Sequence, residues 1–389
     1  MNAYRRAAFL AGALALAAAG CGAAGPPPAA SVLAPPRASA LTPPTPAPAV
    51  DVRAARLRLA ASSPALALGT GTVADAELGR ADAAYAGGDY AAAARGYERA
   101  AGLDPTDPAP LVGLARARLG EADVPTDFGA APGDATALAA ADLLRRALGL
   151  EPGYAPALLE LGRTLLVLGS APEALDALSA ASSVSPADAE ACSALGIAQL
   201  ALGRVGEAVT SLGRAARLEP ASAERQSGLG TALLVQGRTA EALAAFERAA
   251  ELAPADPKIR TNLGTAYLAA GDPGRGMPHL KAAVAAEPGR ATYRANLGYG
   301  LLLGGQVDRA VAELRQALEL DPRLATAWIT LGNALVKKGE RAAAREAYLK
   351  ARDIDPTDPR VSAVLQELDE IEREAKAKGK KKDGPQLRR

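Results

Sequence analysis

The sequence predicts an all-α protein, an α-solenoid of stacked helix pairs, and three observations predict it. A proline recurs every 34 residues, and a Leu-Gly pair and a second glycine recur with the same interval. Aromatic residues make up only 3 % of the chain, whereas a large compact core relies on aromatic side chains for much of its buried area. A fixed interval of this length is typical of units that bury their apolar faces by stacking on one another. The recurring prolines are Pro152, Pro186, Pro220, Pro254, Pro288, Pro322 and Pro356.

Residues 1–20 indicate an export signal, because Arg5 and Arg6 precede a short apolar run that ends in small residues. The run is shorter than the ~20 apolar residues that a membrane-spanning helix needs. Cys21 follows, and Ala18-Ala19-Gly20-Cys21 resembles the bacterial lipobox, although Ala18 stands where that motif usually has Leu. The resemblance implies a lipoprotein with acyl chains such as palmitate on Cys21, each buried CH₂ group adding ~0.8 kcal/mol of membrane affinity. A secreted protein with a coincidental cysteine is the alternative.

The residues after Cys21 indicate which membrane would hold the lipid anchor and what kind of linker follows it. In lipoproteins of this kind an Asp after the cysteine favours the inner membrane; Gly22 stands here, so the resemblance favours the outer membrane, facing the periplasm. Residues 21–73 are expected to form a Pro/Ala-rich linker, since the nine prolines in residues 25–50 favour extended polyproline II of ~3.1 Å per residue. This linker is either a stalk or a spacer without a further role. One loose helix is expected within residues 51–73.

When the 34-residue units are aligned, the recurring residues form columns, and each column has a structural role. The Leu of the Leu-Gly pair begins the buried stripe of a first helix, and the Gly after it lets a neighbouring helix approach closely because it has no Cβ. The second glycine, Gly169 and its equivalents, lies where the first helix must end, since positive φ costs glycine little. In the second helix, Ala344, Tyr348 and Ala351 lie on one face, and the recurring proline ends that helix.

This set of columns resembles the tetratricopeptide repeat, a 34-residue helix–turn–helix, most fully from Ala325 to Pro356. The resemblance implies a right-handed superhelix of eight repeats, whose concave face is lined by the first helices. We expect the repeats at residues 74–107, 108–154, 155–188, 189–222, 223–256, 257–290, 291–324 and 325–358, followed by a capping helix at 359–378 and a basic disordered tail at 379–389.

Three repeats depart from the pattern. The first has Arg80-Ala81 in place of the Leu-Gly pair. The second carries about 13 extra residues near positions 121–134, including Phe128, which either tucks into the fold or contacts a partner. The sixth has Gly276 and Pro278, so its second helix is expected to start late or bend. Trp328 in the eighth repeat is the only large aromatic side chain in its column.

The resemblance implies that a partner peptide or helix binds in the groove along the first helices. The expected groove is weakly polar with an aliphatic ridge. Packing between repeats is the alternative for the leucines, and a solvated surface is the alternative for Ser and Thr. The expected groove residues are Arg163, Ser193, Ile197, Leu200, Ser227, Thr231, Leu234, Thr261, Thr265, Leu268, Tyr299, Leu302 and Asn333.

The sequence does not favour catalysis. His279 is the only histidine, so no histidine cluster can bind a metal, and we expect no catalytic residue, cofactor or small-molecule substrate. Cys192 stands at a position that, by the resemblance, usually holds a large apolar residue, and it is expected to be a buried, inert thiol. The net charge of +1 gives no general attraction to nucleic acid. For the basic tail, a solvated, disordered end is favoured over a specific contact with anionic lipid or nucleic acid.

We therefore expect a lipid-anchored scaffold or adaptor of the bacterial cell envelope whose partners are other proteins, from assembly, secretion or peptidoglycan machinery. A structural spacer or self-associating layer without a client is the alternative. A regulatory arm of an envelope enzyme is less favoured, because the chain shows no catalytic domain.

Overall fold

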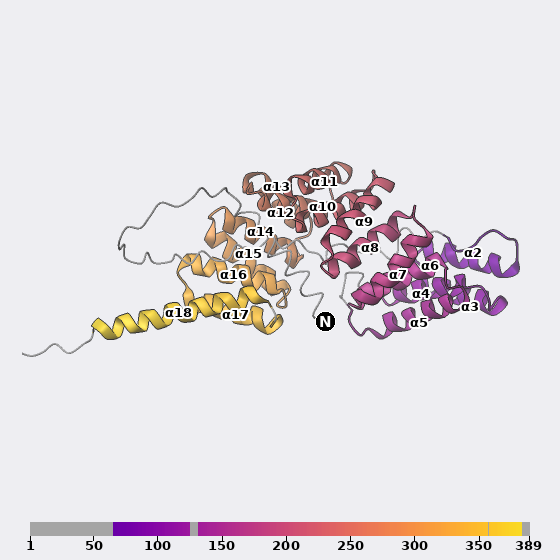
Figure 1. Ribbon diagram of the computed structural model, residues 1–389, viewed down its shortest axis with the longest axis horizontal. Helices are drawn as coiled ribbons and strands as arrows, with labels where there is room; N and C mark the ends of the chain where they lie inside the picture. The colour runs from indigo at the N-terminus through magenta and orange to yellow at the C-terminus, as the bar shows by residue number, and fades with distance from the viewer. Residues whose placement is uncertain (1–64, 125–130, 357, 383–389) are drawn as a thin grey trace, which may run out of the picture. The chain divides into compact units, whose positions relative to one another are not determined.

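The computed structural model describes residues 65–124, 131–356 and 358–382, and within them the chain is an all-α solenoid (Figure 1). The described residues contain seventeen α-helices and no β-strand. They fall into two compact parts, which divide after Leu252. No helix among the described residues combines the length and the apolar character needed to span a bilayer.

The first part contains five helix pairs. Their bounds are α2 (Val73–Ala86), α3 (Tyr90–Leu103), α4 (Ala109–Glu121), α5 (Ala135–Leu150), α6 (Ala155–Val167), α7 (Ala171–Val184), α8 (Ala189–Ala201), α9 (Val205–Leu218), α10 (Ala223–Val235) and α11 (Thr239–Leu252).

The second part contains three helix pairs and a final helix. Their bounds are α12 (Pro257–Ala269), α13 (Pro273–Ala286), α14 (Ala291–Leu303), α15 (Val307–Leu320), α16 (Ala325–Lys338), α17 (Arg341–Ile354) and α18 (Pro359–Lys382).

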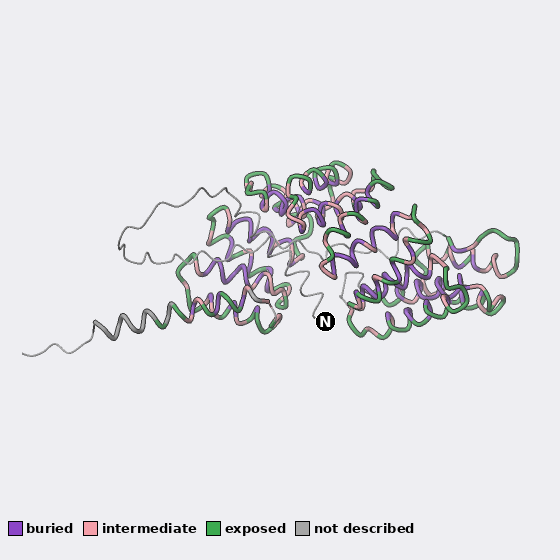
Figure 2. The backbone as a smooth tube through the Cα atoms, viewed as in Figure 1, coloured by how far each residue is buried: buried purple, intermediate pink, exposed green. Residues whose placement is uncertain are grey.

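Within each part, every first helix packs on the second helix of its own repeat, and that second helix packs on the first helix of the next repeat. The two kinds of helix are buried to different extents (Figure 2). In α6 every residue from Ala157 to Val167 is buried, whereas α7 buries only the side that carries Ala174 and Leu178. The first helices are therefore the better covered layer, and the second helices face solvent on one side.

The recurring prolines end the second helices as expected. Pro322 lies two residues after the end of α15, and Asp321 between them has the extended backbone (φ −139°) that a following proline favours. Glu151 and Ser185 precede prolines in the same way, with φ of −139° and −122°. The second glycine column turns the chain between the two helices with positive φ, at Gly169, Gly203, Gly237, Gly271, Gly305 and Gly339.

The glycine of the Leu-Gly pair is required by close packing. A Cβ on Gly332 would lie 2.6 Å from the ring of Tyr348, and a Cβ on Gly162 would lie 2.3 Å from Leu178. Both partners come from the second helix of the same repeat. The glycine therefore sets how closely the two helices of one repeat approach.

A side-chain N–H near the start of four first helices bonds to the recurring proline before it. Trp328 Nε1 donates to the carbonyl oxygen of Pro322 at 2.9 Å. Three repeats place a different donor in the same column, and each bonds to the proline carbonyl six residues earlier: Arg294 to Pro288, Arg260 to Pro254 and Gln226 to Pro220.

The structure describes the irregular second repeat in part and the irregular sixth repeat in full. The insertion joins α4 to α5, and Val124 within it is buried, while Phe128 lies outside the described residues. In the sixth repeat, α13 begins at Pro273, in step with its equivalents, so the expected late start is wrong. A Cβ on Gly276 would lie 2.7 Å from the carbonyl oxygen of Gly264, so glycine fits this close contact.

The ends of the array differ in how much the structure describes. Residues 65–72 lead into α2 without helix, while the signal, the lipidation site and residues 51–64 of the segment expected to hold a loose helix lie outside the described residues. The expected capping helix is α18, which packs on the last repeat and continues to Lys382. Val361, Val364, Leu365 and Leu368 bury its apolar stripe.

Candidate functional site

The predicted groove residues all lie on first helices, but most are less accessible than a solvated groove requires. Twelve of the thirteen are buried, and only Leu234 on α10 is half-buried. Leu268, Tyr299 and Leu302 belong to the apolar core of the second part. The packing alternative is therefore favoured for these residues. A fully solvated Ser and Thr surface is excluded, because Thr265, like its equivalents, is buried.

The threonine hydroxyls on these helices are occupied by their own backbone. Thr231 Oγ1 donates to the carbonyl oxygen of Ser227 at 3.0 Å, and Thr265 Oγ1 donates to that of Thr261 at 3.0 Å. Thr261 Oγ1 in turn donates to the carbonyl oxygen of Pro257 at 2.8 Å. A hydroxyl bonded to the preceding turn of its helix has no hydrogen left to donate to a ligand. We call the side of the first helices that carries these threonines the inner face. It is consequently less polar than its sequence indicates.

Asn333 on α16 is also a packing residue. It is fully buried, and its Oδ1 accepts a hydrogen bond from Tyr348 Oη on α17 at 2.6 Å. Burial raises the pKa of Tyr348, and the nearby charge of Glu367 raises it further. The phenol therefore stays protonated as the donor, and this bond ties the two helices of the eighth repeat together.

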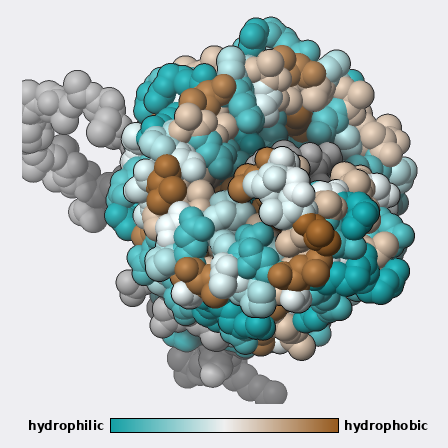
Figure 3. Space-filling model, turned by 90° about the vertical axis from the view of Figure 1, so that its right-hand side faces the viewer, coloured by the Kyte–Doolittle hydropathy of each residue, from teal (hydrophilic) through white to brown (hydrophobic). Residues whose placement is uncertain are grey.

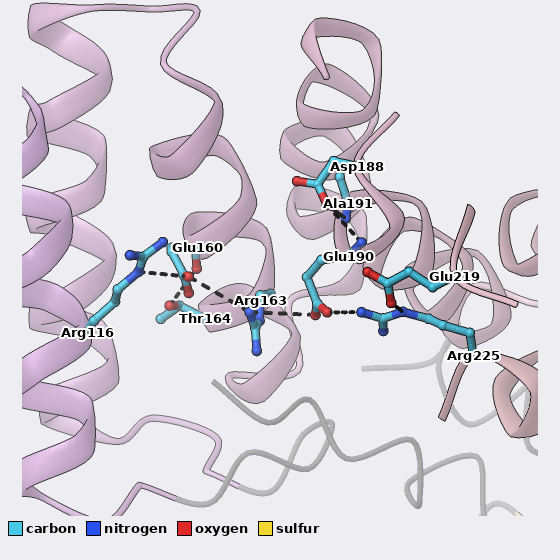
Figure 4. A network of polar contacts seen from close by, with 9 residues as sticks. All are labelled: Arg116, Glu160, Arg163, Thr164, Asp188, Glu190, Ala191, Glu219 and Arg225. Carbon is cyan, nitrogen blue, oxygen red and sulfur yellow. Dashed lines mark hydrogen bonds and ion pairs between the residues drawn. The ribbon is translucent and has the colours of Figure 1, made fainter. Parts of the chain in front are cut away.

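The most distinctive polar feature is a charge ladder across four successive first helices of the first part, α4, α6, α8 and α10, together with Glu219, which directly follows α9. We define it as Arg116, Glu160, Arg163, Glu190, Arg225 and Glu219. Figure 4 shows Arg116, Glu160, Arg163, Glu190 and Arg225 in one line, with basic and acidic groups alternating, and Glu219 beside Arg225.

The ladder is most deeply buried at its α4 end. Glu160 Oε1 accepts a hydrogen bond from Arg116 Nε at 2.9 Å and lies 3.8 Å from Arg163 Nη1. Arg163 Nη1 lies 3.6 Å from Glu190 Oε1. The side chains of Glu160 and Arg163 are each only 1 % exposed, so their attraction is little weakened by solvent.

The α10 end of the ladder approaches solvent. Arg225 donates through Nη2 to Glu190 and through Nε to Glu219, the latter at 3.1 Å. Burial lowers the pKa of Arg225, but the charge of Glu190 and its hydrogen bond more than offset this, and the pKa is raised overall. Three arginines face three glutamates, so the ladder is neutral as a whole. It joins neighbouring repeats and leaves no excess charge for a charged ligand.

Sequence reasoning found only Arg163 of this ladder. The other members occupy different columns of the repeat, so no 34-residue interval connects them. A usable signal was present, because Glu160 stands where the next two repeats have Ala194 and Gly228. A charge in a column of small residues indicates a specific buried partner.

The residues considered for catalysis do not gather into a site. No group of three or more His, Cys, Asp or Glu side chains among the described residues could hold a metal ion. His279 stacks on Tyr267 with a centroid distance of 5.9 Å, and burial together with the charge of Arg260 lowers its pKa. Cys192 is buried, as expected of an inert thiol.

Family comparison agrees with this architecture. Residues 193–257, 233–298 and 301–368 match the tetratricopeptide repeat family. The chain contains tetratricopeptide repeats. Proteins of this family are generally non-catalytic scaffolds, and the repeat array supports binding to protein partners.

Two solved structures share the fold. A chain of the APC/C hetero-tetramer Cut9–Hcn1 is 19 % identical with a TM-score of 0.54, over 77 % of this chain and 57 % of that one. A tetratricopeptide repeat protein from Parabacteroides merdae is 15 % identical with a TM-score of 0.51, over 67 % of this chain and 98 % of that one. This chain therefore spans just over half of the Cut9–Hcn1 relative. No curated protein sequence matches this chain.

Proposed function

We propose that this tetratricopeptide-repeat protein is a lipid-anchored adaptor of the bacterial cell envelope, facing the periplasm from the outer membrane. It binds a segment of a partner protein along its first helices. The observation that carries the binding role is the alignment of equivalent residues on successive first helices, which provides one repeated surface. The anchor rests on the lipobox-like run that ends at Cys21.

The chemistry of the inner face favours an extended, largely uncharged segment. The charge ladder is already paired, and the threonine hydroxyls are bonded to their own helices. A strongly charged ligand would have to break a buried ion pair, which costs ~3–5 kcal/mol. An apolar or weakly polar segment avoids that cost, and it can reach the half-buried Leu234.

The binding role is tested by placing a charge on α10. The Leu234→Glu variant should no longer retrieve the partner from detergent extracts, because a carboxylate cannot be buried under an apolar segment. Ala244→Glu, on the exposed side of α11, is the matched control and should retrieve it. Circular dichroism checks that both variants stay helical. Equal retrieval by both variants would contradict a binding face on the first helices.

The anchor is tested separately by cell fractionation. A Cys21→Ser chain should move from the membrane to the soluble fraction, because the acylated sulfur is lost. Cys192→Ser changes the buried cysteine instead and should leave the chain in the membrane fraction. A Cys21→Ser chain that still sediments with membranes would remove the lipid anchor from the account.

A further inference from the structure

The small net charge of the whole chain hides a strong asymmetry along it. Residues 65–252 contain 14 arginines, no lysine and 24 acidic residues, a net charge of −10. Residues 253–375 contain 17 basic and 17 acidic residues and are neutral. Residues 376–389 contain seven basic residues and one aspartate. The chain therefore combines an acidic array with a short cationic segment.

The cationic segment begins on α18. Leu368 is the last residue of this helix that is described as buried, and the helix continues for 14 residues to Lys382, a length of about 21 Å at ~1.5 Å per residue. Figure 1 shows α18 running past α17, the helix that it caps. Five lysines lie in the last seven residues of α18: Lys376, Lys378, Lys380, Lys381 and Lys382. The helix thus carries them beyond the repeat on which it packs.

The acidic array offers a matching edge. The last residue of each second helix in four successive repeats is an exposed aliphatic side chain, at Leu103, Leu150, Val184 and Leu218. In three of the four, the next residue is acidic. We call this row, together with Asp104 and Glu151, the acidic edge; Glu219 is left out because it already pairs with Arg225 in the charge ladder.

This edge combines two kinds of surface. Its aliphatic residues are 39–52 % exposed. On the face of the molecule drawn in Figure 3, the exposed apolar groups form separate patches bordered by hydrophilic surface. A lysine suits such a surface, because its methylene stem covers the apolar group while its ammonium reaches the neighbouring carboxylate.

We propose that the acidic edge binds the lysine-rich end of α18 from a second copy of this chain. Opposite charges steer the two copies together, and lysine stems cover the exposed leucines. The contact joins two different surfaces, so it is heterologous and links copies head to tail into a row. The lysine-rich end of α18 is expected to bind a second copy and not the last repeats of its own chain, because residues 253–375 carry no net charge. This contact does not depend on the inner face that binds the partner.

Sedimentation velocity of the Cys21→Ser chain, which lacks the anchor, tests the self-association. The average mass should rise with protein concentration at about 50 mM salt. At about 500 mM salt the association should weaken at least ~10-fold, because the screening length shortens from ~10 Å near 0.1 M to ~3 Å at 1 M. Replacing the five lysines by Gln should leave a monomer at both salt concentrations, while replacing them by Arg should preserve the association.

Reversing the charges of the two proposed surfaces tests whether the acidic edge is the one that binds the lysines. A chain with Glu151→Lys and Ser185→Lys should remain monomeric alone, and so should a chain whose five lysines are changed to Glu. Mixed together, the two chains should associate, because each now carries the charge that the other lacks. Circular dichroism confirms that both variants are folded.

Three results would overturn the proposal. The unaltered chain could remain monomeric at low salt, or its association could survive the change of all five lysines to Gln. The mixed charge-exchange variants could fail to associate. If the Gln variant loses only its binding to vesicles containing anionic phospholipid and sediments like the unaltered chain, the lysines serve a membrane and not a second copy.

Discussion

The indole Nε1 of Trp328 donates a hydrogen bond to the carbonyl oxygen of Pro322, six residues earlier, at 2.9 Å. Arg294 and Arg260 occupy the same column and make the same bond to their own prolines, at 2.8 and 2.6 Å. The property that these positions share with Gln226 is therefore an N–H donor, and the aromatic ring is dispensable; Leu158 and Cys192 occupy the same column without such a donor. The bond satisfies a carbonyl that follows the end of the preceding second helix.

A Trp328→Phe variant should be less stable by about 0.5–1.5 kcal/mol, because it keeps a ring but leaves the Pro322 carbonyl without its donor. Trp328→Arg should recover most of that loss, since arginine makes the bond at position 294. The measurement is urea unfolding followed by circular dichroism. If Trp328→Phe and Trp328→Arg unfold at the same urea midpoint, the hydrogen bond to Pro322 does not contribute to stability.

Glu160→Gln should destabilise the first part by ~3–5 kcal/mol, because it removes the carboxylate between two buried arginines, Arg116 and Arg163. Glu151→Gln is the matched control: this glutamate is exposed, and its loss should change stability by less than ~0.5 kcal/mol. Thermal and urea unfolding measure both. Equal, small effects would show that the ladder adds little to the joining of repeats.

Gly332→Ala and Gly149→Ala differ by one methyl group each but should act in opposite directions. The new Cβ at position 332 would lie 2.6 Å from the ring of Tyr348, and such overpacking costs about 1–3 kcal/mol. At position 149 in α5 nothing lies within 4 Å, so the better helix propensity of Ala should stabilise by ~0.5–1 kcal/mol. Unfolding midpoints test the pair. A neutral Gly332→Ala would show that the two helices can separate without cost.

Burial raises the pKa of Tyr299 to about 12, from an ordinary value of 10.0. The folded chain therefore holds the phenol neutral where the unfolded chain ionises it. This contribution to stability is complete below pH 10 and is lost as the pH rises towards 12. Between about pH 9 and pH 11, Tyr299→Phe should lose less stability than the unaltered chain. Equal losses in a urea titration at both pH values would contradict this.

The sequence predicted the parts of the fold that repeat. Gly169 has positive φ, and α15 ends just before Pro322, because local backbone chemistry alone decides both. The helix pairs followed from the same columns. The interval alone could not predict the bonds of Trp328 and Gln226 to their prolines, because these donors look unrelated in a sequence.

The charge ladder and the buried hydroxyls could not be predicted from the sequence either. Arg116 and Glu160 lie 44 residues apart, an interval that matches no column. Thr231 was expected in a polar groove, yet its hydroxyl bonds to its own helix, a choice that depends on how closely the next repeat covers it. Burial of this kind is decided by packing between repeats, which the pattern of one repeat does not contain.

The central claim is that a partner lies along the first helices. A photo-crosslinking amino acid placed at Leu234 on α10 in living cells should capture one partner protein, while the same probe at the exposed Ala244 on α11 should not. Capture from position 244 with none from position 234 would place the partner on the second helices and contradict the account.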